Sequence, residues 1–112
     1  MIINGVRFEI DFTDADFIEK VENACKKVFE EAGKLKQDKE ISLAEGIRQE
    51  CKILKDFLDY VLGDGTSEKL FKGKDSLNQC LQAFEDIIDA KQNSMNDFQS
   101  KISKYSPDRL KR

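Results

Sequence analysis

Three cysteines, Cys25, Cys51 and Cys80, carry the most reactive side chains of this chain. The sequence has no histidine and no Cys-x-x-Cys pair, so a zinc site would need three distant thiolates and a carboxylate or a water. Each cysteine lies on or beside the apolar stripe of an expected helix, which is the pattern of small buried thiols. We therefore expect no metal site, and a disulfide framework is not expected in the cytosol.

Carboxylates are the other side chains that could do chemistry. Without histidine, general acid–base work would fall to carboxylates, lysine, cysteine or tyrosine, and none of these occurs in a recognisable catalytic arrangement. Asp14 and Asp16 form an acidic pair at positions expected to be exposed, so we interpret them as surface charge. Gly63-Asp64-Gly65 fits a turn, because the phosphate-loop and calcium-loop patterns are missing. The sequence predicts a protein that is not an enzyme and uses no cofactor.

The composition favours one helical domain. The chain has 112 residues, of which 37% are charged and 39% hydrophobic, and its net charge is −3. This balance argues against a nucleic-acid partner, because binding to phosphates needs clustered positive charge. No basic segment with an apolar core opens the chain, and no apolar run reaches the roughly 18 to 20 residues that span a membrane. We expect a cytoplasmic protein with no membrane partner.

The first residues predict a β-hairpin. An Asn4-Gly5 turn is followed by strict alternation of apolar and polar residues. By the two-residue period of a strand, one face holds the apolar side chains Val6, Phe8, Ile10 and Phe12. A two-stranded ribbon is marginal alone in water, so the hairpin must pack on helices or pair its edge with another chain.

Two long helices are predicted next. Thr13 or Asp14 can cap the first helix, whose apolar stripe extends to about residue 35. The second begins at the capping box Ser42-Leu43-Ala44-Glu45 and stops at Gly63. Its expected apolar stripe is Leu43, Ile47, Cys51, Leu54, Leu58 and Val61.

A short helical turn and a last long helix complete the chain. The turn covers residues 67–72 and is closed by Gly73. The last helix opens at Ser76, with Gln79 completing a second capping box, and can run until Pro107, a length of about thirty residues. The predicted fold class is mainly α (α+β), with an N-terminal β-hairpin packed on a bundle of three longer helices plus one short helical turn and a long C-terminal helix.

We predict one domain over 1–112 with distinct parts. These are a β-hairpin over 1–12, a helical core over 13–90, an extension of the last helix over 91–106 and a basic tail over 107–112.

The last helix carries a coiled-coil-like stripe, spaced alternately by four and three residues. Its apolar members are Leu77, Leu81, Phe84, Ile88, Met95, Phe98, Ile102 and Tyr105, and Lys91 interrupts the series. The first half of this helix should lie in the core. Beyond Ala90 the stripe thins, and we predict a protein-binding surface there, formed by Met95, Phe98, Ile102 and Tyr105. The alternative is that the second half folds alongside the first helix or the hairpin.

Several segments resemble a known class of small proteins. They are Ile3-Asn4-Gly5, Phe8 to Asp16, Val61 to Thr66 and Leu70 to Lys74. In these segments the chain resembles tail assembly chaperones encoded in tail-morphogenesis regions of phages and prophages of Gram-positive bacteria, and the likeness covers roughly residues 2–90. The resemblance implies a non-enzymatic protein that coats the apolar helices of the tape measure protein and helps tail-tube subunits polymerise around it, in the host cell cytoplasm. It supplies no catalytic or binding residues.

Two other functions fit the sequence. One is a small phage-encoded inhibitor that sequesters a host defence protein, for which the acidic segment over residues 8–19 would imitate nucleic acid. The other is a self-assembling structural protein whose last helix pairs with copies of itself. Lys91 at a seam position favours a small homo-oligomer with a fixed register.

Overall fold

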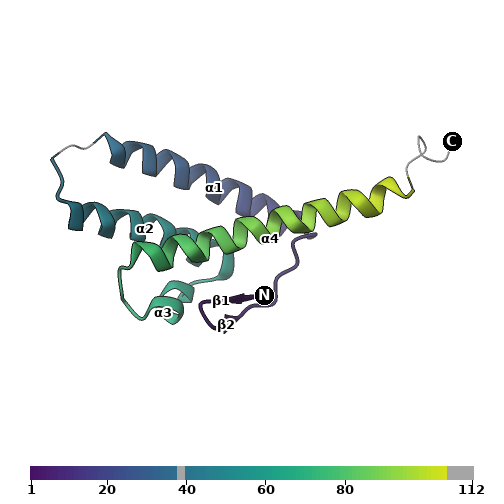
Figure 1. Cartoon of the computed structure of the whole chain (residues 1–112), viewed down its shortest axis with the longest axis horizontal. Helices are drawn as coiled ribbons and strands as arrows, with labels where there is room; N and C mark the ends of the chain where they lie inside the picture. The colour runs from purple at the N-terminus through teal and green to yellow at the C-terminus, as the bar shows by residue number, and fades with distance from the viewer. Residues whose placement is uncertain (38–39, 106–112) are drawn as a thin grey trace.

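The computed structural model describes residues 1–37 and 40–105, which form a helical bundle with a hairpin at its N-terminal end (Figure 1). The order of elements is β1 (Ile2–Ile3), β2 (Val6–Arg7), α1 (Ala15–Lys36), α2 (Leu43–Leu62), α3 (Thr66–Phe71) and α4 (Leu77–Ser103). The predicted fold class is confirmed, with one short helix, α3, and three long helices, of which α4 is the last and the longest.

Asn4 and Gly5 turn the hairpin at φ values of 47° and 80°. A tight hairpin turn needs positive φ at both central residues, which explains the Asn-Gly pair. The antiparallel pairing extends one residue beyond the strands, because the Phe8 amide donates to the Met1 carbonyl at 2.8 Å. The hairpin predicted over 1–12 therefore exists, but its backbone pairing ends at Phe8.

The hairpin is fixed to the bundle by one buried side chain and one hydrogen bond. Ile3 is fully buried, and the Asn4 side-chain amide donates to the Leu70 carbonyl in α3 at 2.7 Å. Beyond Phe8 the chain keeps its alternation, and Phe12 packs on the core although its backbone is no longer paired. Of the predicted apolar face, Val6, Phe8 and Phe12 pack against the core and stabilise the two-stranded ribbon, whereas Ile10 does not belong to this packed set.

Side-chain caps set the helix starts where the sequence predicts them. Asp14 accepts from the Phe17 amide at 3.0 Å at the start of α1, and Ser42 accepts from the Glu45 amide at 3.1 Å at the start of α2. Ser76 accepts from the Gln79 amide at 3.4 Å and caps α4.

The end of α4 differs from the prediction. The helix ends at Ser103 rather than running to Pro107, which lies outside the described residues, as does the predicted basic tail over 107–112. The last described residues, Lys104 and Tyr105, form a turn after the helix and are exposed.

The core lies around α2, which packs against α1, α3 and α4. Its members are Ile3, Val21, Ala24, Val28, Cys51, Leu54, Phe57, Leu58, Val61, Leu70, Phe71, Cys80, Ala83 and Ile87. Two predicted core positions are wrong. Leu43 is exposed because it begins the first turn of α2, beyond the packed part, and Leu81 is 39% exposed because α4 turns Cys80, Ala83 and Ile87 to the core instead.

The molecule is elongated because α4 leaves the bundle. Its extents are 61 × 31 × 21 Å and its radius of gyration is 17.3 Å, compared with about 13 Å for a compact domain of roughly 100 residues. Figure 1 shows the second half of α4 extending past α1, α2 and the hairpin.

Candidate protein-binding surface

The four residues predicted to bind protein form an uncovered apolar line, in which Met95, Phe98 and Ile102 lie on the second half of α4 and Tyr105 follows two residues after its end. Their exposed fractions are 38% for Met95, 50% for Phe98, 53% for Ile102 and 79% for Tyr105. No residue from Lys91 to Ser103, a range that the structure describes completely, is buried. This half does not fold back along α1 or the hairpin (Figure 1). We call these four residues the bare stripe.

Lys91 marks the point where α4 leaves the bundle. It is half-buried, and its ammonium group lies close enough to Cys25 in α1 to affect the pKa of that thiol electrostatically. Burial raises the pKa of Cys25, and the positive charge of Lys91 partly opposes this rise. The lysine that interrupts the apolar series therefore lies near α1, with its charge close to the half-buried Cys25 thiol.

A second set of apolar residues on α4 was not predicted as surface. Leu81 and Ile88 are partly exposed in the first half of the helix, and they lie fourteen and seven residues before Met95, respectively. Residues seven apart lie on nearly the same side of a helix. The heptad spacing in the sequence already placed Leu81 and Ile88 on one side of the helix with Met95. The spacing alone did not show that the core would use the adjacent side of α4 instead.

The cysteines are structural. Cys51 and Cys80 are fully buried and hydrogen-bonded to each other between α2 and α4, and all three cysteines are free thiols. Burial, followed by the hydrogen bond with Cys51, raises the pKa of Cys80 to about 12. Such a thiol stays protonated at neutral pH and is a poor nucleophile and metal ligand. Within residues 1–37 and 40–105, no group of three or more metal-binding side chains comes together.

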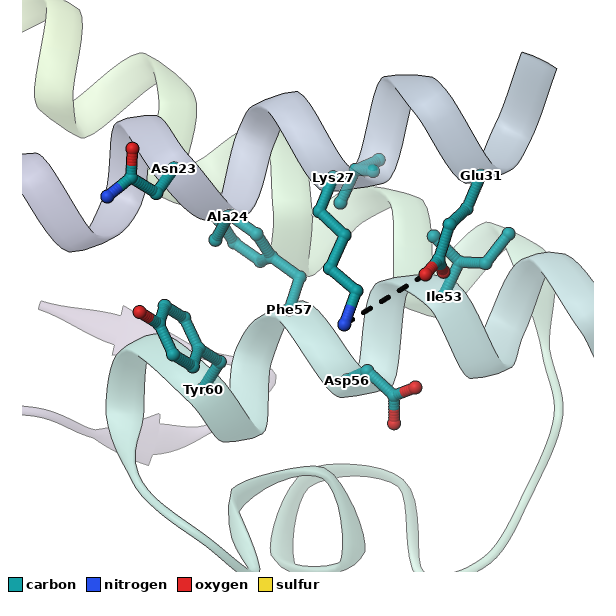
Figure 2. A pocket seen from close by; sticks show the side chains of 9 residues that line it. Asn23, Ala24, Lys27, Glu31, Ile53, Asp56, Phe57 and Tyr60 are labelled. Carbon is teal, nitrogen blue, oxygen red and sulfur yellow. Dashed lines mark ion pairs between the residues drawn. The ribbon is translucent and has the colours of Figure 1, made fainter. Parts of the chain in front are cut away.

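A groove of about 300 Å³ separates α1 from α2 and was not predicted (Figure 2). Its lining residues are Asn23, Ala24, Lys27, Val28, Glu31, Ile53, Asp56, Phe57 and Tyr60. Finding this groove requires the relative placement of two helices, which no single stretch of sequence encodes.

Charged side chains at the rim of the groove are already paired. Figure 2 shows Lys27 extending from α1 and meeting Glu31, with 4.0 Å between Nζ and Oε1. Lys52 pairs with Asp56 at 3.0 Å. The groove thus offers an apolar floor with a neutralised rim, which suits an apolar side chain better than a charged ligand.

The acidic segment near the N-terminus is partly used for local structure. Asp11 accepts hydrogen bonds from the Thr13 hydroxyl and amide, and these bonds lower the pKa of the Asp11 carboxyl. Asp14 caps α1. The remaining carboxylates of this segment, Glu9, Asp16 and Glu19, are exposed and spread over a loop and a helix start.

The hairpin, the α2-centred core and the bare stripe define a small mainly helical protein with one uncovered helix end. The chain belongs to a family of unknown function, DUF6673, whose profile matches residues 4–112. Neither the curated proteins nor the solved structures gave a match. Among the residues that the structure describes, none of the helices combines the length and apolar character needed to cross a membrane.

Proposed function

We propose that this protein is a non-enzymatic protein-binding protein and that the bare stripe is its docking surface. Within that class, we assign it the role of a phage tail assembly chaperone that binds the tape measure protein and/or tail-tube subunits in the host cytoplasm. The observation that carries the proposal is the line of four exposed apolar residues along and just after the second half of a helix that extends beyond the bundle. The resemblance in the hairpin and in the turns around Gly63 and Gly73 supports the narrower role.

The chemistry of the stripe suits a helical partner. Met95, Phe98 and Ile102 follow the three- and four-residue spacing by which one helix packs on another. The aromatic side chains Phe98 and Tyr105 are types that carry much of the binding energy in protein interfaces. A partner with its own apolar helical face, as the resemblance implies for the tape measure protein, would remove both faces from water.

Charged residues beside the stripe favour a partner helix of complementary charge. Lys101 and Lys104 accompany one side of the stripe with Asp97, and the other side carries the neutral residues Gln92 and Gln99. A partner helix with carboxylates on the matching side would bind faster at low salt than one with lysines there.

The test is co-expression with the tape measure protein encoded in the same gene cluster. We expect the wild-type chain to keep that protein soluble and to co-purify with it. Phe98→Asp combined with Ile102→Asp should abolish co-purification, because it places two charges in the apolar contact. The matched control combines Asn93→Asp with Ser100→Asp, which add the same charges on the opposite side of α4.

Co-purification that survives the stripe variant would refute the assignment of the docking surface. Loss with both variants would show a general effect of negative charge. If binding instead requires Asp16 and Glu19, tested as Asp16→Asn with Glu19→Gln, the inhibitor alternative replaces the chaperone proposal.

A further inference from the structure

An outer apolar line runs along almost the whole length of α4. It consists of Leu81, Ile88, Met95 and Ile102, which are all partly or largely exposed. The four residues repeat every seven positions and span about 32 Å at the helical rise. They are left outside the bundle because the core takes the adjacent side of α4, with Cys80, Ala83 and Ile87.

Length decides what can cover this line. The bare stripe alone covers about three helical turns, and a helix pair of that length is marginal in water. From Leu81 to Ile102 the apolar series on α4 covers three heptads, which reaches the length that sustains a two-helix coiled coil. A helix that covers the whole outer line must therefore lie along both halves of α4.

The geometry points to a second copy of this chain, with the two α4 helices antiparallel and their crossing centred at Asn93. In this register Ile88 faces Phe98 of the second copy, and Leu81 lies opposite the end of the second copy's α4, where Tyr105 follows the helix. Two-fold symmetry repeats both contacts, so the half-exposed residues of each first half are covered by the exposed residues of the other second half.

Lys91 distinguishes the antiparallel pair from the parallel one. A parallel pair would place Lys91 directly against Lys91 of the second copy, and like charges in a seam are destabilising. The antiparallel register places each Lys91 against Met95 of the second copy, so the two ammonium groups lie in different layers. The residues beside the symmetry axis, Gln92 and Ser94, carry no charge. The charge pattern of the chain thus suits only the antiparallel arrangement.

Phe29 provides an independent reason to expect cover beside the first half of α4. It is 68% exposed on α1, one turn beyond Cys25 on the same side of that helix. Cys25 is the α1 residue whose thiol lies near Lys91 of α4. Phe29 is therefore a large exposed apolar side chain one helical turn from the thiol that lies near Lys91.

The dimer does not depend on the proposed function, since it concerns the free protein. Both use the bare stripe, so a client helix would bind by displacing the second copy. Failure of the co-expression test would leave the dimer untouched, and a monomeric free protein would leave client binding untouched.

A matched pair of variants tests the register. Met95→Glu should keep the dimer or tighten it, because each new carboxylate faces Lys91 of the second copy. Met95→Lys has the opposite charge in the same place and should weaken the dimer by at least about tenfold. The measurement is size exclusion with light scattering across a concentration series, with circular dichroism to confirm equal helix content.

A distance measurement tests the orientation. Spin labels on Ser103→Cys, in a Cys25→Ser background, should lie about 30 Å apart in the antiparallel pair and within about 20 Å in a parallel pair. Cys51 and Cys80 are buried and should not take the label.

Three outcomes would overturn the inference. They are a monomer throughout the concentration series, equal loss of dimer in Met95→Glu and Met95→Lys, or a short distance between the Ser103 labels.

Discussion

The two halves of α4 share one apolar spacing but have different surroundings. From Leu77 to Ala90 the helix packs on α2, and Ile87 is fully buried there. From Lys91 to Ser103 it contributes nothing to the core, and its apolar side chains face solvent. The same helical period therefore identifies a helix with an apolar side, but it does not say what covers that side.

The buried side of the first half adds a second lesson. Cys80, Ala83 and Ile87 lie one position before Leu81, Phe84 and Ile88, so the bundle uses the side next to the heptad line. Phe84 still contacts Phe57 edge-on, with 4.9 Å between ring centroids. A helix with two adjacent apolar sides can pack one side into its own core and leave the other side exposed for a partner.

The largest expected difference between the halves is in core energetics. Ile87→Ala should lower the free energy of unfolding by about 2 to 5 kcal/mol, because it leaves a cavity in the packed core. Ile102→Ala should change it by no more than about 0.5 kcal/mol, because the side chain is exposed. Urea unfolding followed by circular dichroism, at a concentration where the protein is monomeric, measures both. Similar losses would mean that the second half is part of the core.

Titration at high pH gives the next effect. The pKa of Cys80 is about 12 in the fold and 9.0 for an unperturbed thiol, so the folded state holds this proton more tightly than the unfolded state. The stabilisation is complete below pH 9 and is lost as the pH rises toward 12. Between these values, wild type should lose stability faster than Cys80→Ala, by about 1 kcal/mol per pH unit. Ser100→Ala, in the exposed half, is the control, and parallel curves for wild type and Cys80→Ala would contradict the burial argument.

A smaller difference should separate the two ends of α4. Ser76→Ala removes the acceptor for the Gln79 amide at the packed end and should cost about 1 kcal/mol. Ser103→Ala, at the exposed end, should stay within about 0.5 kcal/mol. Thermal unfolding compares the two variants, and an equal effect would remove the distinction between a fixed start and a free end.

The smallest expected change in stability belongs to the bare stripe itself. Phe98→Asp with Ile102→Asp should stay within about 1 kcal/mol of wild type, which is the cost of helix propensity alone. Asn93→Asp with Ser100→Asp should match it closely in urea unfolding. Global unfolding of the stripe variant would show that these residues support the fold rather than a partner.

Local signals made much of the fold predictable. The Asn4-Gly5 turn and the caps Ser42 and Ser76 act on neighbouring residues, so their effect can be predicted from a few letters of sequence. The four candidate binding residues are exposed, because the stripe continues past the packed part of the bundle, and their binding to a protein stays a prediction.

The remaining features depend on tertiary placement. Leu43 fits the α2 stripe by spacing, yet it is exposed because α2 begins before its neighbours reach it. The choice of Ile87 over Ile88 for the core follows from the angle at which α4 crosses α2, and the groove between α1 and α2 follows from their separation. None of these quantities is encoded in a local pattern.

The hydrogen bond from Asn4 to Leu70 also constrains the order of events during synthesis. Its two residues are 66 positions apart, which a ribosome covers in about 3 to 13 s at ordinary elongation rates. During that interval Ile3 emerges from the ribosome before the core that later buries it has formed. The hairpin is therefore synthesised first but can dock on the bundle only after α3 has been synthesised. Until then the nascent chain exposes an unpaired β-strand edge, which can pair with other chains.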